Sequence, residues 1–501
     1  MIRAINLFID RTTMYRLMLY YLCMLFIAAL IFGATGVLPF VAPTALLWSA
    51  VVLIASAWVA NTFFAWAFDA VTNLESVYIT PLILVLILPS VAFSNLSGTI
   101  SLIAIAVTAM ASKYILAIGK KHIFNPAALA VAASGFFLGI YASWWVAGNI
   151  PLLPFIFLGG IMIVKKLRKS DLVLVFAATT VVAVAFTSVN PITAIPALFL
   201  HTTLFFFSFV MLTEPLTMPN ARKLRIAYGI FVGILFTPAL HISWLYSSPE
   251  LSLVTGNLFA YLVSPKRGYM LSFVERRVLA NGIYEYLFRS DRPLVFKPGQ
   301  YLEWTLGSVP LDTRGNRRFF TIASAPEDKL VALGVRFYDK PSAFKRTLAA
   351  LTVGDEISVA SLAGEFTVPK DTKKKLAFIA GGIGVTPFAS MARHSIATGE
   401  SRDAILIYSC KTAAEIAYRE VFIRAALLGW RTAYVLSDEE APGAHHGFID
   451  AELIKKEIPD YRQRLFYVSG PPGMVDAMKA MLLSLGISRF NIKTDFFPGL
   501  A

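Results

Sequence analysis

The sequence predicts a multi-domain protein with a polytopic α-helical membrane domain of about ten spans, a β-barrel lobe and an α/β nucleotide-binding lobe. Charge is the first observation behind this prediction: residues 1–267 hold only 15 of the 45 Lys and Arg and 6 of the 31 Asp and Glu. Long apolar stretches fill the same part of the chain. Residues 268–370 then alternate apolar and polar residues in short runs, whereas residues 371–501 alternate apolar strands with helix-length segments.

Composition excludes several classes of protein. The net charge of +14 does not indicate nucleic-acid binding, because +9 of it lies in the apolar part, where membrane topology explains it. Cys23 and Cys410 are too few for an all-cysteine iron–sulfur cluster or a cysteine-rich zinc site, so no metal site is expected. The apolar run over residues 17–37 is too long for a cleavable signal peptide.

Ten apolar stretches are candidates for spanning helices, because a bilayer needs about 20 mostly apolar residues. They cover about residues 14–37, 43–69, 75–93, 98–118, 126–145, 147–165, 171–188, 193–213, 223–245 and 250–264. Lys and Arg cluster in the N-terminal segment, in alternate loops and after the last stretch, and the other loops lack them. The positive-inside rule therefore predicts an integral membrane protein of the bacterial inner-membrane type, with both termini and the soluble part in the cytoplasm.

Polar residues stand out within the membrane domain, mostly at the predicted cytoplasmic ends of its spans. The candidate site residues there are Asn73, Lys120, Asn125, Pro126, Glu214 and Asn257. Pro126 suits the first turn of a helix that Asn125 caps. A carboxylate at the end of an apolar span is costly unless it is paired, so Arg222 or Lys120 is the expected partner of Glu214. At any single position, a helix cap or a loop turn explains the residue equally well.

Several short motifs occur in order across about residues 70–262. They are Lys121-His-Ile-Phe-Asn-Pro-Ala-Ala128, Phe157-Leu-Gly-Gly160, Phe209-Val-Met-Leu-Thr-Glu-Pro-Leu-Thr217, Tyr228-Gly-Ile-Phe-Val-Gly233 and Gly256-Asn257. In these motifs the chain resembles the B-type membrane component of the sodium-pumping NADH:quinone reductase and the D-type membrane component of the Rnf electron-transport complex. The resemblance implies a ten-helix redox domain that handles flavin and, as in the NADH:quinone reductase, quinone.

One departure from these membrane components concerns their covalent FMN. They carry it on the threonine of a Ser-Gly-Ala-Thr motif in the outer loop after the fifth span. This chain has Trp144-Trp-Val-Ala-Gly-Asn-Ile-Pro151 at that place. We therefore expect no phosphoester-linked FMN, and a noncovalent FMN in the membrane domain stays open.

The soluble part contains two glycine-bearing turns that each follow an apolar strand. Gly381-Gly-Ile-Gly-Val-Thr-Pro-Phe388 follows a strand at 376–380, and Ser469-Gly-Pro-Pro-Gly473 follows a strand at 464–468. Glycines let the backbone approach a pyrophosphate at a helix N-terminus, and ligands bind outside the carboxyl ends of parallel strands. With further strands at 404–408 and 431–436, these turns predict a dinucleotide site.

Together with Arg318-Phe-Phe-Thr321, these features resemble the ferredoxin–NADP reductase superfamily over about residues 268–500. The resemblance implies an FAD-binding β-barrel at 268–370 and an NAD(P)-binding lobe at 371–501. It implies that Arg318 binds the FAD pyrophosphate, that Phe320 stacks on the isoalloxazine and that the Thr321 hydroxyl approaches flavin N5. The other implied cofactor-binding residues are Val335, Ser342, Gly382, Gly384, Thr386, Pro387, Gly470 and Pro471.

The same resemblance implies three catalytic residues, Thr321, Ser469 and Phe497. Ser469 stands where relatives usually have cysteine beside the site of hydride transfer, and Phe497 is the candidate for an aromatic side chain near the flavin. Lys411 is a weak substitute for the arginine that NADPH-specific relatives often have, so NADH is the preferred coenzyme.

The predicted function is therefore electron transfer from NAD(P)H via FAD to the membrane domain, and on to quinone, bound flavin or another acceptor. The lipid bilayer is a partner, and quinone and other electron-transfer subunits are candidate partners. One alternative is a transmembrane, ferric-type reductase with haem. Two haems need four axial ligands, and the membrane part offers only His122, His201 and His241. A redox-driven ion pump or transporter is the other alternative, although carboxylates are scarce within the spans.

Overall fold

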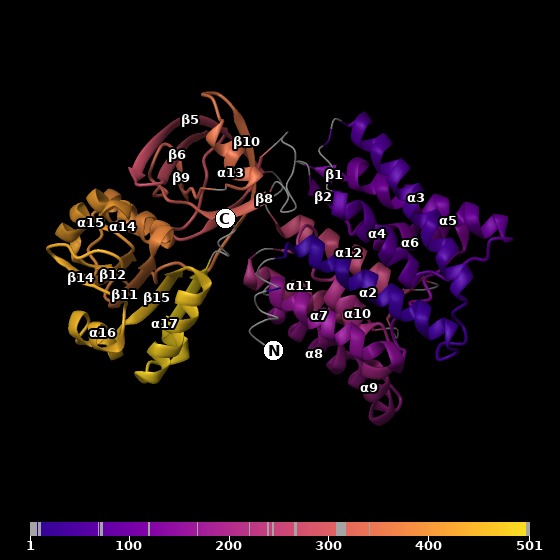
Figure 1. The fold of residues 1–501 in the computed structure, drawn as a ribbon. Helices are drawn as coiled ribbons and strands as arrows, with labels where there is room; N and C mark the ends of the chain where they lie inside the picture. The colour runs from indigo at the N-terminus through magenta and orange to yellow at the C-terminus, as the bar shows by residue number, and fades with distance from the viewer. Residues whose placement is uncertain are drawn as a thin grey trace. The chain divides into compact units, whose positions relative to one another are not determined.

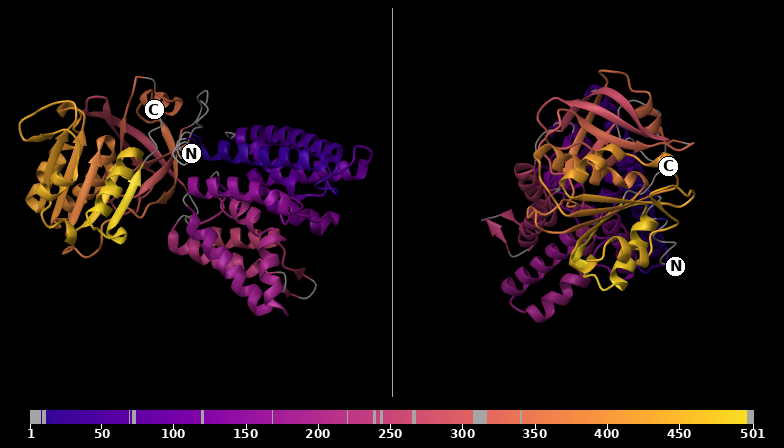
Figure 2. Two further views of the ribbon diagram at one scale, coloured as in Figure 1. Left: turned by 60° about the horizontal axis from the view of Figure 1, so that its bottom comes forward. Right: turned by 90° about the vertical axis from the view of Figure 1, so that its left-hand side faces the viewer.

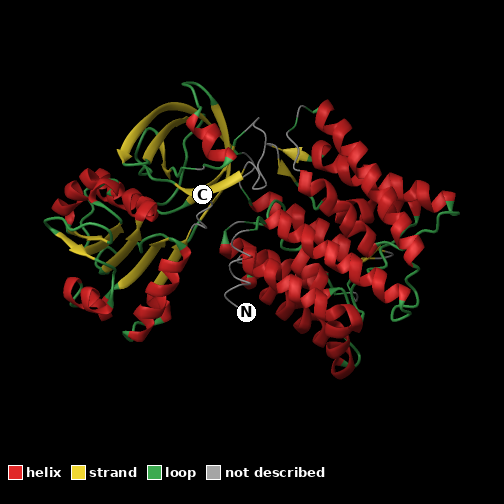
Figure 3. Ribbon diagram, viewed as in Figure 1, coloured by secondary structure: helices red, strands yellow, loops and turns green. Residues whose placement is uncertain are grey.

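A computed structural model describes residues 8, 12–68, 70, 74–118, 121–167, 169–219, 221–237, 240–242, 245–264, 268–306, 317–339 and 341–496. The chain divides into two compact units, Met1–Arg267 and Gly268–Ala501, called unit 1 and unit 2 below (Figure 1). In the described residues, unit 1 is almost entirely helical, whereas unit 2 combines two six-stranded sheets with helices (Figure 3).

Unit 1 has a helix in each of the ten apolar stretches of the sequence. The helices are α2 (Met14–Ala34), α3 (Pro43–Ala67), α4 (Leu74–Ile87), α5 (Leu96–Ile115), α6 (Pro126–Leu138), α7 (Leu153–Leu167), α8 (Ser170–Thr187), α9 (Pro191–Leu200) with α10 (Leu204–Phe206) and the π-helix η2 (Phe207–Met211), α11 (Arg222–Leu235) and α12 (Pro249–Val263). The 3-10 turn η1 (Ile150–Leu152) precedes α7. Two short hairpins complete the unit, β1 (Ala117–Ile118) with β2 (Lys121–His122) and β3 (His241–Ile242) with β4 (Leu245–Tyr246).

Helix length limits how many of these segments can be counted as spans. Among the described residues, five helices are long and apolar enough to cross a membrane: α2, α3, α5, α8 and the continuous segment Ile150–Leu167. The pair Pro191–Leu200 and Leu204–Met211, bent by 57°, gives a sixth if it is one broken span. The predicted count of about ten spans is thus not confirmed, and the predicted orientation stays a prediction.

Two glycines allow close packing around the end of the bent pair. A Cβ atom at Gly159 of α7 would lie 2.0 Å from the Tyr21 ring of α2, and a Cβ at Gly160 would lie 2.0 Å from the Phe209 ring of η2. Small residues at helix interfaces let backbones approach in this way. This packing holds η2 in place, and the chain continues from η2 directly to Glu214.

The first half of unit 2 is an antiparallel sheet. Its strands are β5 (Tyr269–Ala280), β6 (Ile283–Ser290), β7 (Tyr301–Thr305), β8 (Arg317–Thr321), β9 (Val331–Arg336) and β10 (Glu356–Ala363), in the order β8-β7-β10-β5-β6-β9, with one helix, α13 (Ala343–Ala349). Trp304 and Phe288 are fully buried in its core. The pairing of the described strands runs from β8 to β9 without a pair that closes it, so the barrel stays a prediction.

The second half of unit 2 is a parallel sheet with helices on both faces (Figures 1 and 2). Its strands are β11 (Leu376–Gly381), β12 (Ala404–Cys410), β13 (Trp430–Leu436), β14 (Ala444–His446), β15 (Leu465–Gly470) and β16 (Ile492–Phe496). Its helices are α14 (Thr386–Thr398), α15 (Arg419–Ala425), α16 (Ala451–Glu457) and α17 (Pro472–Ser484). The four strands that the sequence predicts here are confirmed.

Side chains on the two faces of the central strand β11 belong to two different hydrophobic cores. Phe378 of β11 packs with residues of α14 and α15, whereas its neighbour Ile379 packs with residues of α16 and α17. Successive side chains of a strand point to opposite faces, so an uninterrupted apolar strand needs cover on both. The strand order is β14-β13-β12-β11-β15-β16, which reverses direction between β11 and β15. Ligands of such sheets bind at that reversal, outside the carboxyl ends of the strands.

Candidate functional site

The two predicted glycine turns meet at the reversal of the parallel sheet. Ala380 of β11 is paired with Ser469 of β15, so the turns that follow these strands are neighbours. A Cβ at Gly384 would lie 2.6 Å from Gly470 Cα and 2.7 Å from the Ser469 carbonyl oxygen. Gly382 has φ +52°, a conformation that glycine adopts at no steric cost. Both positions therefore require glycine, one for space and one for backbone conformation.

The remaining residues of the predicted nucleotide motif begin the two helices at this edge. Thr386 and Pro387 lie in the first turn of α14, and the Thr386 hydroxyl donates to the Ile383 carbonyl at 3.2 Å. Pro471 precedes α17, whose own first turn is directed to the same edge. Free N–H groups at the start of a helix attract phosphate oxygens. The geometry thus provides a cradle for a coenzyme pyrophosphate.

Ser469 lies at the floor of this cradle. Its side chain is fully buried, and its Oγ has no hydrogen-bond partner among the described residues. A buried hydroxyl without a partner costs stability, so the Ser469 hydroxyl is available to a ligand or to an ordered water. Burial raises the pKa of the nearby strand residue Cys410 to about 11, so its thiol stays protonated at neutral pH.

In the antiparallel lobe, the predicted flavin motif lies along β8. Alternation puts Arg318 and Phe320 on the same side of the strand. The Phe320 and Phe344 ring centroids are 5.6 Å apart, and the Arg318 guanidinium carbon lies 5.6 Å from the Phe344 ring. The structure therefore brings the β8 motif next to the start of α13, where Ser342 Oγ accepts from the Lys345 N–H at 3.4 Å. Val335 is buried in the same core, so its side chain is a packing group there.

Thr321 ends β8 and has the same property as Ser469. It is 3 % exposed, and its Oγ1 has no hydrogen-bond partner among the described residues. Each of the two lobes thus has a buried hydroxyl, without a partner among the described residues, at a position that the resemblance links to hydride transfer. Phe497, the third predicted catalytic residue, lies outside the described residues.

Ion pairs join the two lobes of unit 2 around this site. Arg393 of α14 contacts Glu285 of β6 at 2.9 Å. Arg336 of β9 forms a two-pronged pair with Glu415, which follows β12, with one N–O distance of 2.9 Å. Arg336 Nη1 is 3.7 Å from where a Cβ at Gly382 would stand, so the pair flanks the glycine turn. The sequence did not predict this ion pair, because Glu415 lies 79 residues after Arg336 and no sequence motif links the two.

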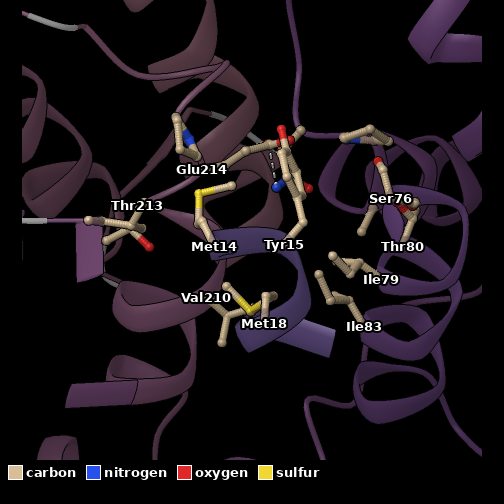
Figure 4. A pocket seen from close by; sticks show the side chains of 15 residues that line it. Met14, Tyr15, Met18, Ser76, Ile79, Thr80, Ile83, Val210, Thr213 and Glu214 are labelled. Carbon is tan, nitrogen blue, oxygen red and sulfur yellow. Dashed lines mark hydrogen bonds between the residues drawn. The ribbon is translucent and has the colours of Figure 1, made fainter. Parts of the chain in front are cut away.

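Unit 1 contains a pocket between α2, α4, the start of α6 and the segment after η2 (Figure 4). Its apolar lining includes Met14, Met18, Ile79, Ile83, Leu167 and Val210, and its polar lining includes Ser76, Thr80, Asn125, Thr213 and Glu214. The predicted residues Asn125, Pro126 and Glu214 thus lie on one cavity.

Glu214 is the centre of a hydrogen-bond cluster at the edge of this pocket. Its Oε1 lies 3.0 Å from His122 Nε2, and its Oε2 accepts from Asn125 Nδ2 at 2.9 Å and from Thr217 Oγ1 at 3.1 Å. Of the two expected partners of Glu214, Arg222 lies against Asp171 at 3.7 Å. The β1–β2 hairpin, which ends at His122, carries the imidazole to Glu214 instead. Lys120 and Asn73 lie outside the described residues.

Asn257 ties the cluster to the last two helices of unit 1. This fully buried residue accepts from the Asn125 N–H at 2.8 Å and donates to the Thr217 carbonyl at 3.2 Å and to Tyr228 Oη at 3.3 Å. Asn125 also caps α6, as predicted, by accepting from the Ala128 N–H at 3.0 Å. Four motifs that lie far apart in the sequence therefore meet at one place.

Comparison with known proteins identifies the nucleotide lobe. Residues 378–480 match the family described as "Oxidoreductase NAD-binding domain", which covers β11 to α17. Unit 2 is thus similar to the NAD-binding parts of known oxidoreductases. The reductase subunit of an aromatic O-demethylase from Amycolatopsis is 30% identical over 220 residues, covering 42% of this chain and 64% of its own. The phenol hydroxylase P5 protein of Acinetobacter pittii is 26% identical over 241 residues, covering 46% and 66%.

Solved structures also match this part of the chain. An Amycolatopsis cytochrome P450 reductase covers 46% of this chain and 71% of its own, with 26% identity and a TM-score of 0.42. The chain spans less than two thirds of the length of the curated relatives described above.

Proposed function

We propose that this protein is a membrane-bound, FAD-dependent oxidoreductase that accepts hydride from NAD(P)H, with NADH preferred, and passes electrons to an acceptor at unit 1. The observation that carries the proposal is the meeting of the two glycine turns at Gly384 and Gly470 beside the buried hydroxyl of Ser469. The oxidoreductase NAD-binding family covers the same segment. Five helices suited to cross a bilayer support the membrane location, and we place both termini and unit 2 in the cytoplasm of a bacterial cell.

The residues of unit 2 fit FAD and a nicotinamide coenzyme. Arg318 and Ser342 would hold the flavin pyrophosphate, while Phe320 would lie against the isoalloxazine. FAD, when bound, accepts a hydride and releases single electrons. Thr321 and Ser469 would orient the flavin and the nicotinamide through their hydroxyls, which have no other partner among the described residues. The first turns of α14 and α17 would hold the coenzyme pyrophosphate.

The pocket of unit 1 is our candidate for the acceptor site. A quinone or a noncovalent FMN suits its mixture of apolar walls and polar ends. The names of the relatives support a second kind of acceptor, because they are reductase subunits and components. In that case the electron acceptor would be a separate protein, such as a partner subunit.

The test uses the full-length protein purified in detergent. Acid-released flavins are identified and counted, and NADH oxidation is followed first with ferricyanide and then with a short-chain benzoquinone. We expect FAD at one per chain and NADH oxidation with both acceptors. FAD together with free FMN would make unit 1 a second flavin station. A preparation that holds FAD but does not oxidise NADH with ferricyanide would refute the proposal.

A further inference from the structure

We propose that Glu214, recharged by His122, donates a proton to a quinone that is reduced in the pocket of unit 1. The inference rests on the proposed function, which supplies the electrons. It also goes beyond that function, since electron transfer to a bound carrier needs no proton donor.

Glu214 and His122 stand in series between the cavity and the rest of the protein. Glu214 lines the pocket, whereas His122 does not line it and its Nε2 lies 3.0 Å from Glu214 Oε1. Both side chains are partly buried, with 22 % of Glu214 and 11 % of His122 exposed. A proton on the imidazole therefore reaches the cavity through the carboxylate. This is the arrangement of a donor and its proton reserve.

The Glu214 carboxylate is also held in place. Asn125 and Thr217 both donate to Oε2, which leaves Oε1 to His122. Asn257 in turn forms hydrogen bonds with the Asn125 N–H and the Thr217 carbonyl. These bonds restrict movement of the Glu214 carboxylate when the acceptor changes charge. A fixed donor transfers a proton with little reorganisation.

The pocket has a second polar end. Ser76 and Thr80 of α4 lie on one side of the view in Figure 4, and Thr213 and Glu214 lie on the other. Lys113 of α5 donates to Ser76 Oγ at 3.2 Å and to its carbonyl at 3.1 Å. Methionine and isoleucine side chains also line the pocket. A benzoquinone has the same pattern, with an apolar ring between two carbonyl oxygens.

Other titratable groups face the same region. Lys113 acts on Glu214 through its charge from α5, but its ammonium is engaged by Ser76. Tyr228 of α11 accepts a hydrogen bond from Asn257, and Tyr15 of α2 lines the pocket. His122 differs from these groups because its Nε2 lies within hydrogen-bond distance of Glu214 Oε1, so we assign it as the proton reserve.

The overall step balances as NADH + H⁺ + quinone → NAD⁺ + quinol. The proposed NADH oxidation delivers two electrons to the ring and releases one proton to water. The ring takes up two protons, so one proton is consumed overall, and the reduced oxygens that accept them are strong bases. The Glu214 O–H bond breaks as the quinol O–H bond forms. The carboxylate then takes the proton from His122 Nε2, and water returns a proton to the imidazole. Water also protonates the oxygen at the Ser76 end.

The experiment compares quinone reduction with ferricyanide reduction in the full-length protein, because ferricyanide takes electrons without protons. Glu214→Gln is expected to lower the ratio of the two rates by about 100-fold or more, the range of a general acid. Glu214→Asp should keep part of the ratio, and His122→Gln should lower it less than Glu214→Gln, since water can recharge the carboxylate. The matched control is Asp171→Asn, a carboxylate in unit 1 that pairs with Arg225 and does not line the pocket.

Chemical rescue distinguishes proton donation by Glu214 from a purely structural role of this residue. Formic acid or imidazolium added to Glu214→Gln should restore quinone reduction in proportion to the added acid. An unchanged ratio in Glu214→Gln would overturn the inference and leave the proposed function intact. A loss that no added acid restores, with Glu214→Asp equally defective, would also overturn it. A wild-type protein that reduces ferricyanide but no quinone would refute this inference and favour a flavin or protein acceptor, whereas no NADH oxidation at all would refute the proposed function.

Discussion

Gly384→Ala is the most direct probe of the coenzyme cradle. The added Cβ would lie 2.6 Å from Gly470 Cα and 2.7 Å from both the Gly470 N and the Ser469 carbonyl oxygen. These three atoms all belong to the backbone of one turn, and ordinary van der Waals contacts are 3.4–4 Å. The overlap is therefore close to 1 Å, and no side-chain rotation can relieve it. Either β11 and β15 separate, or the turn after β15 shifts.

Overpacking of this kind costs about 1–3 kcal/mol. If the cost falls on the cradle, the coenzyme binds more weakly by about 5- to 150-fold, which is the same free energy expressed as an equilibrium constant. The FAD lobe lies outside the disturbed turns, so FAD content should stay at the wild-type level. The KM for NADH should rise, and the rate of flavin reduction at saturating NADH should change less.

Gly473→Ala is the matched control. It lies in the same turn motif, but a Cβ there would have no neighbour within 4 Å. We expect it to match or slightly exceed the stability of the wild type, because alanine reduces the entropy of the unfolded chain. The assay is stopped-flow flavin reduction over a range of NADH concentrations, together with thermal unfolding. Wild-type KM and melting temperature in Gly384→Ala would refute the account of how the two turns pack.

Three further predictions test other parts of unit 2. Thr321→Val should slow flavin reduction by NADH about 3- to 10-fold without lowering the melting temperature, because the hydroxyl has no partner among the described residues; stopped-flow and thermal unfolding measure the two effects. Asp460 has a pKa of about 2, below the ordinary 3.8, chiefly because Arg464 donates hydrogen bonds to it. Since a depressed carboxyl pKa stabilises the fold above about pH 4 and loses this effect as the pH falls towards 2, Asp460→Asn should be less stable than the wild type at pH 5 and converge with it near pH 2. Glu415→Gln should release the Arg336 charge beside the glycine turn and lower the KM for both NADH and NADPH a few-fold, because both carry the pyrophosphate that the turn is proposed to hold; unchanged KM values would contradict this role for the pair.

The elements of unit 2 were largely predictable because local rules decide them. Uninterrupted apolar runs predict the buried strands, and β11 begins at Leu376 and β12 at Ala404, as the sequence indicates. Asn125 and Pro126 likewise mark the start of α6, since the cap and the missing N–H belong to single residues. Such signals need no knowledge of distant contacts.

Contacts between distant segments were less predictable. Charge and distance along the chain suggested Arg222 for Glu214, but Arg222 lies in the first turn of α11, where Asp171 of α8 is its neighbour. His122 reaches Glu214 because a hairpin reverses the chain before α6, and nothing in the local pattern fixes where that hairpin points. The number of spans was hard to predict for a related reason, because hydropathy shows where apolar residues lie and not where a helix ends or bends.

The cluster around Glu214 gives a physical reason for motifs that look unrelated in the sequence. Asn257 in the last helix holds Asn125 at the start of α6, and both positions act on the segment from Glu214 to Thr217. Buried polar groups need all of their partners, so a change at one position leaves another unsatisfied. Each motif is therefore constrained by the others. The pocket wall that contains Glu214 can then keep a carboxylate next to an apolar cavity, which is the feature that a proton-coupled acceptor site requires.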